Sequence, residues 1–279
     1  MTEEPQYIKW LVSEVGCIEK YGGNVACYKI DYNDSEDILE DWALHVRRHY
    51  VNDEELKEDA DVVGLSIEDY LKEYVIPQKT DSMGPTARAG TLAEIIFSDL
   101  LEFVLGYHVP RCRQDNMSGK TVSEHGTDVI GYKFANPGKT PSKVDELLAV
   151  EIKAGLSSKD VTVIERAVID SAKDEYRVSL SLNYMRKKLA RMGKVDESND
   201  IRRFQQKTKA GYDYVIKYAA GGITSLSELE KKTIDGIEVE IVPNVDGSKI
   251  TFDNGDAIYF IHGKELMKLT HKVYERCVK

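Results

Sequence analysis

The hydrophobic positions of the chain recur with two different periods. Runs with a period of two predict strands, because successive side chains of a strand point to opposite faces. Such runs occur between residues 7 and 32, and in YHVPRCR, GTDVIGYKF, LLAVEIKAG, YDYVIKYAA, VEIVP, KITF and AIYFI. Runs with a period near 3.6 predict helices after Ser35, around 66–76, over 86–105, within 160–209 with a break near Gly193, and over 264–277.

Strands and helices mixed in this order predict an α/β or mixed α+β fold, with a mixed central sheet flanked by helices. Turn residues at 21–23 predict a hairpin near the N-terminus, and Ser35 is a good N-cap for the helix after it. The helix over 86–105 is apolar over most of its surface, so we expect it to be mostly buried, with Gly106 in its C′ position. Pro110 marks YHVPRCR as an edge strand or a bulge.

A polar stretch, QKTDSMGPT, is typical of a linker because turn formers and two nearby prolines interrupt the pattern. We therefore expect a small acidic N-terminal domain over 1–82, suited to partner docking or regulation, and a larger domain over 83–279. The charge distribution agrees with this division. Residues 1–79 hold 19 acidic against 8 basic residues, which leaves 29 acidic against 30 basic residues for the rest of the chain.

A local basic patch lies in the larger part, where residues 186–209 hold nine Lys or Arg against three acidic residues. Such a patch can neutralise phosphates. On charge alone, a solvated helix face is the simpler explanation.

Several classes of protein are excluded by composition and motif. No apolar run approaches the roughly 18 residues of a membrane helix, and the acidic start MTEEPQ is unlike a signal peptide, so we expect a cytoplasmic protein without membrane contact. The four cysteines lack zinc-ligand spacing and are expected to be free thiols. Two GKT triplets lack the glycine that a phosphate-binding loop requires five residues earlier, so we expect no ATP binding by this chain.

The candidate chemistry is centred on LAVEIKAG, an apolar run that contains Glu151 and Lys153. Residues two apart in a strand share a face, so these two side chains are predicted to project together while Ile152 points the other way. The upstream run GTDVIGYKF supplies Asp128, and neighbouring strands lie only about 4.8 Å apart. Asp128 and Glu151 could thus converge on one cation.

Two carboxylates and the main-chain carbonyl of Ile152 would suit a hard ion such as Mg²⁺, or Mn²⁺. Such an ion lowers the pKa of a bound water and stabilises the charge that develops at phosphorus. Lys153 is positioned to orient that water. Glu94, which the buried helix has no packing reason to contain, could complete the metal shell or hold a ligand through water. Glu124 and His125 are weaker candidates for the same roles.

A purely structural alternative explains the same residues without catalysis. Glu151 and Lys153 could form a cross-strand ion pair on a solvent-exposed face of the sheet, with Asp128 as a surface carboxylate near a turn. Spacing alone does not separate the two interpretations.

A resemblance to known proteins does favour catalysis. Glu94 in a helix, Asp128 in one strand and Glu151-Ile152-Lys153 in the next are similar to the PD-(D/E)XK nuclease superfamily, with Thr-Asp in place of Pro-Asp. The chain also resembles the HamA family, the nuclease subunit of the Hachiman antiphage defence system, in HGTDVIG, VEIKAG, SLNYMRKKL, RRFQQKT and the tail IHGKELMKLTHKVYERC. The likeness is good over roughly residues 84–279 and loose before them.

This resemblance implies a restriction-endonuclease-like core, metal-dependent cleavage of DNA, and a helicase partner similar to HamB. If the resemblance holds, Asp128, Glu151 and Ile152 bind the metal, Lys153 positions the attacking water, and Glu94 supports the ligand shell of the metal. The basic segment then becomes a DNA-facing helix pair, with candidate contacts at Arg186, Lys187, Lys188, Arg202, Arg203, Gln205 and Lys207. Two alternatives stay open: a stand-alone restriction or repair endonuclease, and a non-catalytic DNA-binding regulatory subunit.

Overall fold

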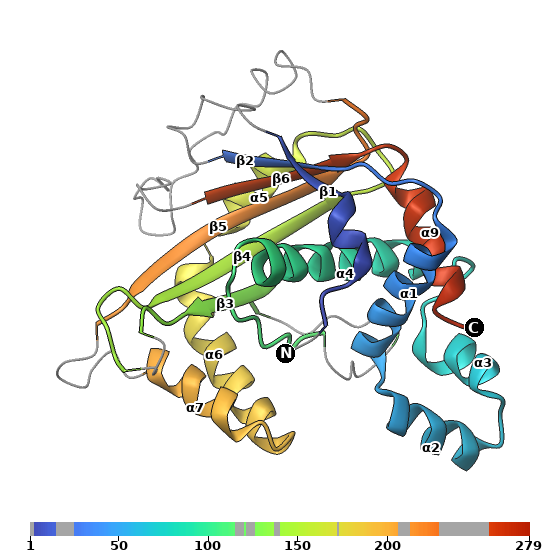
Figure 1. Ribbon diagram of the computed structural model, residues 1–279, viewed down its shortest axis with the longest axis horizontal. Helices are drawn as coiled ribbons and strands as arrows, with labels where there is room; N and C mark the ends of the chain where they lie inside the picture. The colour runs from blue at the N-terminus through green and yellow to red at the C-terminus, as the bar shows by residue number, and fades with distance from the viewer. Residues whose placement is uncertain are drawn as a thin grey trace.

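A six-stranded mixed sheet forms the centre of the protein (Figure 1). The structure is a computed structural model that describes residues 3–14, 25–114, 120, 126–136, 140–171, 173–205, 213–228 and 257–279. The strands are β1 (Leu11–Glu14), β2 (Val25–Ile30), β3 (Val129–Lys133), β4 (Glu146–Gly155), β5 (Val215–Thr224) and β6 (Ala257–Gly263). Their order across the sheet is β1-β2-β6-β5-β4-β3, and the mixed α/β class predicted from the sequence is confirmed.

The middle of the sheet is parallel and its two edges are antiparallel. Pairs β2–β6, β6–β5 and β5–β4 run parallel, whereas β1–β2 and β3–β4 run antiparallel. Parallel strands are covered on both faces and therefore read as continuous apolar runs, which is why β4 and β6 are so hydrophobic. The predicted N-terminal pairing is confirmed, while its turn at 21–23 and the predicted strands VEIVP and KITF lie outside the described residues.

Helices cover both faces of the sheet, and α2 and α3 form a lobe beside it (Figure 1). The helices of the described residues are α1 (Glu36–Tyr50), α2 (Asp53–Val63), α3 (Ile67–Tyr70), α4 (Gly84–Asp99), α5 (Val163–Ser171), α6 (Asp174–Arg191), α7 (Val195–Phe204) and α9 (Leu266–Arg276), with a 3-10 turn at Gln6–Trp10 and π-helical turns at Leu71–Val75 and Leu100–Val104. The long buried helix is confirmed as α4 with its π-helical extension, and Gly106 follows it in the left-handed region. Gly193, with φ of +75°, separates α6 from α7 as expected.

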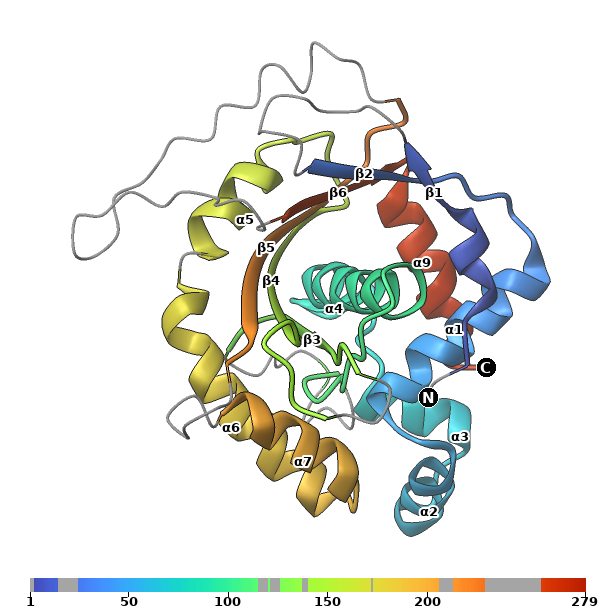
Figure 2. The same cartoon turned by 60° about the vertical axis from the view of Figure 1, so that its left-hand side comes forward.

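Two layers of core result from this arrangement. Figure 2 shows α4 lying inside the curve of the sheet near α9 and α1, with α5 and α6 on the outside. Leu148, Val150 and Ile152 of β4 belong to the inner cluster with α4, whereas Leu147 and Ala149 belong to the outer cluster with α6 and α7. Consecutive side chains of β4 therefore pack on opposite faces of the sheet, which is the alternation predicted for this strand.

The N-terminal segment is built into this framework. Strand β2 pairs with β6, and Tyr7 and Trp42 lie in the same cluster as α4 and α9. The buried carboxylate of Asp99 accepts a hydrogen bond from the Tyr7 hydroxyl at 2.5 Å and lies 3.0 Å from His45 Nε2. Residues 3–14 and 25–82 thus share the sheet and the core with the rest of the described chain. A separate function for residues 1–82 stays a prediction.

Two local expectations are wrong. YHVPRCR is reduced to one bridge between His108 and Tyr132, because Pro110 lacks an N–H and Arg111 adopts a positive φ of 52°. That turn carries the Arg111 guanidinium into the core, 2.6 Å from Asp99. Ser35 occupies the N-cap position of α1, but its side chain makes no capping hydrogen bond.

The close approach of α4 to the sheet depends on Gly221 of β5. A Cβ at Gly221 would lie 2.8 Å from the Phe97 ring and 3.2 Å from Ile152, whereas a Cβ at Gly90 of α4 would meet nothing within 4 Å. We expect Gly221→Ala to destabilise the protein by about 1–3 kcal/mol through overpacking. Gly90→Ala should stabilise it by about 0.5–1 kcal/mol through helix propensity. Urea unfolding measures both, and equal effects of the two variants would contradict this packing.

Candidate active site between strands β3 and β4 and helix α6

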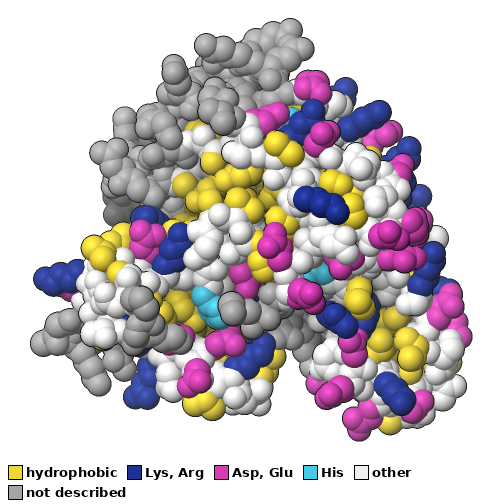
Figure 3. Space-filling model, in the orientation of Figure 1, with side chains coloured by type: hydrophobic (Ala, Val, Ile, Leu, Met, Phe, Trp, Pro, Cys, Tyr) yellow, Lys and Arg dark blue, Asp and Glu magenta, His cyan; other side chains and the backbone are white. Residues whose placement is uncertain are grey.

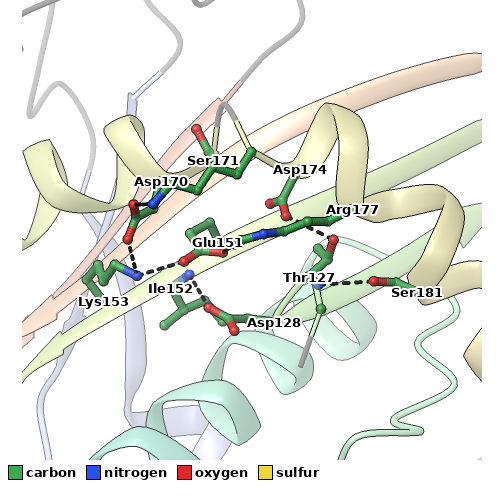
Figure 4. A network of polar contacts seen from close by, with 12 residues as sticks. Thr127, Asp128, Glu151, Ile152, Lys153, Asp170, Ser171, Asp174, Arg177 and Ser181 are labelled. Carbon is green, nitrogen blue, oxygen red and sulfur yellow. Dashed lines mark hydrogen bonds and ion pairs between the residues drawn. The ribbon is translucent and has the colours of Figure 1, made fainter. Parts of the chain in front are cut away.

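Strand β4 carries a charged pair on the outer face of the sheet. Glu151 and Lys153 lie beside Ala220 and Gly222 of β5 in register, so small neighbours leave room for both side chains. Lys153 Nζ lies 2.7 Å from Glu151 Oε1 and 2.8 Å from Asp170 Oδ2, at the end of α5 (Figure 4). Glu151 is only 4% exposed, so this pair is not an ion pair on a solvent-exposed face of the sheet.

Asp128 joins this pair from the start of β3. Its Oδ2 atom accepts a hydrogen bond from the Ile152 backbone amide at 2.8 Å. The last described pair of the β3–β4 ladder is Val129 with Val150, so Asp128 lies at the level of Glu151. The structure therefore brings together the three residues of the candidate metal site, although the predicted ligand of Ile152 is its carbonyl and not its amide.

Glu94 approaches from α4, and an arginine that sequence reasoning missed lies beside it. Arg113 Nη1 lies 2.8 Å from Asp128 Oδ1, and its Nη2 lies 3.9 Å from Glu94 Oε1. No signal in the sequence marked Arg113, which lies in a run that we expected to be a strand. Its position follows from the turn at Arg111. Arg113 neutralises part of the charge of the two carboxylates.

Helix α6 fixes the segment before Asp128. The Thr127 amide donates to Ser181 Oγ at 3.1 Å, and the Thr127 hydroxyl donates to Asp174 Oδ1 at 2.9 Å (Figure 4). Gly126 has φ of +136°, and a Cβ there would come within 2.7 Å of Ser181 Oγ. Asp174 is fully buried and is a further carboxylate of the site that the sequence did not reveal.

Crowding of these carboxylates changes their acidity. Burial, with Asp128 and Glu151 nearby, raises the pKa of Glu94 to about 8 against the opposing effect of Arg113. Burial and the charge of Glu151 raise the pKa of Asp174 to about 7. Burial and the charge of Asp128 also raise the pKa of Glu151. A cation bound among these carboxylates would stabilise their charged forms and lower their pKa values.

The oxygen atoms present fit a hard divalent cation. Glu151 Oε2 and Asp174 Oδ2 are buried and have no hydrogen-bond partner among the described residues, although Arg177 Nη1 lies 3.5 Å from the former. Within the described ranges, no group of three or more His, Cys, Asp or Glu side chains is arranged to hold a metal ion. Mg²⁺ needs only one or two carboxylates when water and phosphate complete its shell. A cation on Asp128 Oδ1 would require Arg113 to move away.

The candidate DNA contacts have diverse environments. Arg186 donates to Gln205 Oε1 at 2.9 Å. Arg203 lies 3.2 Å from Asp145 Oδ2, with its guanidinium 4.0 Å from the centre of the Phe134 ring. Lys187 and Arg202 are exposed, and Lys188 is half-buried. Lys207, Glu124 and His125 lie outside the described residues. Roles in DNA binding stay predictions for all of them.

The fold and site define a mixed α/β protein with a cluster of buried carboxylates and an adjacent lysine where the middle of β4 passes the start of β3. The model of one family, HamA, matches residues 5–277, which is nearly the whole chain. The chain therefore belongs to the HamA family and is a Hachiman-associated defence protein. No curated protein matches it.

None of the helices in the described part of the chain is long and apolar enough to cross a membrane.

The raised pKa of Glu94 predicts how stability depends on pH. Between the unfolded value of 4.5 and the folded value of about 8, the folded state binds more protons, so the free energy of unfolding falls as pH rises. We expect a loss of about 2–4 kcal/mol from pH 5 to pH 9 without divalent cations. Glu94→Gln should reduce that loss, and the exposed Glu58→Gln should not. Urea unfolding at several pH values tests this, and equal slopes for Glu94→Gln and wild type would refute it.

Proposed function

We propose that this protein is a metal-dependent DNA nuclease and the effector of a defence complex that acts with a helicase. The observation that carries the proposal is the hydrogen bond between Asp128 and the Ile152 amide, which sets two carboxylates and Lys153 at one point of the sheet. That set of residue types matches the PD-(D/E)XK pattern. Membership of the HamA family supports the same conclusion.

The residues of the site have distinct roles in this mechanism. Asp128, Glu151 and the Ile152 carbonyl would hold Mg²⁺ or Mn²⁺, which when bound supplies an activated water and charge stabilisation at phosphorus. Lys153 would orient the attacking water near Glu151, because its ammonium is anchored by Glu151 and Asp170 and has three donors. Glu94 would support the metal-binding carboxylates from α4. Arg113 would have to release Asp128 Oδ1 for that oxygen to hold a metal.

Helix α6 supports DNA as the substrate. It begins at the site with Asp174 and leads to Arg186, Lys187 and Lys188, about 18 Å away at 1.5 Å per residue. A nucleic acid lying along the helix would contact both ends. The negative phosphodiester backbone would then be held by basic side chains while one phosphate reaches the carboxylates.

A surface for the partner is proposed at the N-terminal segment. The lobe formed by α2 and α3, at the lower right in Figure 3, carries acidic side chains next to apolar ones. Val62, Ile67 and Tyr74 there are 79%, 46% and 50% exposed. Exposed apolar side chains within a charged surface are typical of protein docking sites. This lobe is the candidate contact for the helicase.

One observation favours a second function. Both oxygens of Asp128 are engaged, Oδ1 by Arg113 and Oδ2 by the Ile152 amide. A site that keeps this arrangement would bind no metal, and the protein would be a non-catalytic DNA-binding subunit.

A cleavage assay separates the two functions. We expect Glu151→Ala and Lys153→Ala each to reduce DNA cleavage by at least about 100-fold, because the first removes a metal ligand and the second the group that positions the water. Linear and circular DNA are incubated with the protein and Mg²⁺, with and without the helicase and ATP.

Lys268→Ala is the matched control, because Lys268 forms a surface ion pair with Glu265 at the start of α9 and lies outside the α2–α3 lobe. It should cleave like wild type. Wild-type activity in Glu151→Ala protein would exclude the assigned site, and absence of cleavage by the wild type in every mixture would favour the non-catalytic subunit.

A further inference from the structure

The outer face of α6 exposes two large apolar side chains close to the candidate site. Tyr176 is 61% exposed and Leu180, one turn later, is 73% exposed. Both belong to a helix whose other face packs through Val178, Leu182, Met185 and Leu189. Single exposed apolar residues are common, but a pair on successive turns beside a candidate active site suggests a ligand with apolar faces.

Basic side chains continue the same face. Positions 176, 180, 184, 187 and 191 follow the helical period, so they lie on successive turns of one side. Lys187 and Arg191 are exposed, and the Lys188 ammonium lies 5.7 Å from the centre of the Tyr184 ring. Apolar and aromatic groups are thus followed by cations along one line.

Arg177 joins this face to the candidate site. Its guanidinium is 3.5 Å from Glu151 Oε2, and its side chain is 39% exposed. The charge of Arg177 also opposes the rise in the pKa of Asp174. Among the described residues, no hydrogen bond joins its guanidinium to another side chain, so N–H donors remain available. A guanidinium with available donors is suited to bidentate binding of a phosphate.

We propose that the outer face of α6 is a track for a single DNA strand. Arg177, Lys187, Lys188 and Arg191 contact its phosphates, while bases stack on Tyr176 and pack against Leu180. Cations combined with exposed aromatic rings are how proteins bind single strands, since an unpaired base offers its flat face and a paired base does not. A second protein is the less favoured occupant, because the cations match a polyanion.

The length of the track sets the size of its ligand. Arg177 and Arg191 are 14 residues apart, which is about 21 Å along the helix. At about 3.4 Å per stacked nucleotide, this corresponds to about six nucleotides. The proposal rests on the proposed function in assigning the strand as the substrate of the Glu151 site. The binding itself needs no metal and no cleavage.

Fluorescence anisotropy with labelled single-stranded and duplex oligonucleotides, in EDTA, tests the track on the full chain. We expect Tyr176→Ala to weaken single-strand binding about 10-fold, Tyr176→Phe to stay within about twofold of wild type, and Arg177→Ala to weaken binding severalfold. Duplex binding should change less with Tyr176→Ala. Affinity for single strands should rise with length up to about six nucleotides and then level off.

Matched controls are Val144→Ala, which shortens an apolar side chain 64% exposed outside α6, and Arg166→Ala, which removes a surface arginine of α5. Single-strand binding that is equal in Tyr176→Ala, Val144→Ala and wild type overturns the track and leaves this face to a protein partner. Loss of binding in Tyr176→Phe as severe as in Tyr176→Ala also overturns it, because the ring is retained. Cleavage is assayed separately with Mg²⁺, so an inactive protein with an intact track refutes the proposed function alone.

Discussion

The burial of Glu151 in the centre of the sheet is the constraint on which the site depends. A carboxylate that is 4% exposed loses most of its hydration, and proteins tolerate this only when opposite charge or a proton compensates. Lys153 and Arg177 supply part of the compensation. Asp128 and Asp174 oppose this compensation, because they add negative charge: Asp128 raises the pKa of Glu151, and Glu151 in turn raises that of Asp174. Such an arrangement destabilises the fold, and the proposed cation would offset that cost.

The surrounding elements can be understood as the support of this carboxylate cluster. Small residues on β5 make room for Glu151 and Lys153 on one face and for α4 on the other. Helix α6 holds Thr127 through Asp174 and Ser181, and so fixes Asp128 against the Ile152 amide. The N-terminal segment completes the sheet and packs around Asp99 at the end of α4. Each layer therefore restrains one side of the site.

Local patterns in the sequence predicted much of this arrangement. Period-two alternation in LLAVEIKAG placed Glu151 and Lys153 on one face, and the hairpin-like spacing placed Asp128 beside them. Residues that reach the site from distant parts of the chain could not be predicted in this way. Arg113 arrives through a left-handed turn at Arg111, and Asp174 through the packing of α6, neither of which leaves a periodic signal. The surroundings of the basic segment could not be predicted either, because charge alone does not show that Arg203 lies over Phe134 and near Asp145.

Binding of a divalent cation tests the central claim most directly. Calorimetric titration of Mn²⁺ into the wild type and Asp128→Asn compares proteins that differ in one carboxylate oxygen, since asparagine can still accept the hydrogen bond from the Ile152 amide. The account predicts binding by the wild type and affinity at least about 10-fold weaker in the variant. Isotherms that are identical for the two proteins, or no heat of binding in the wild type, would contradict it.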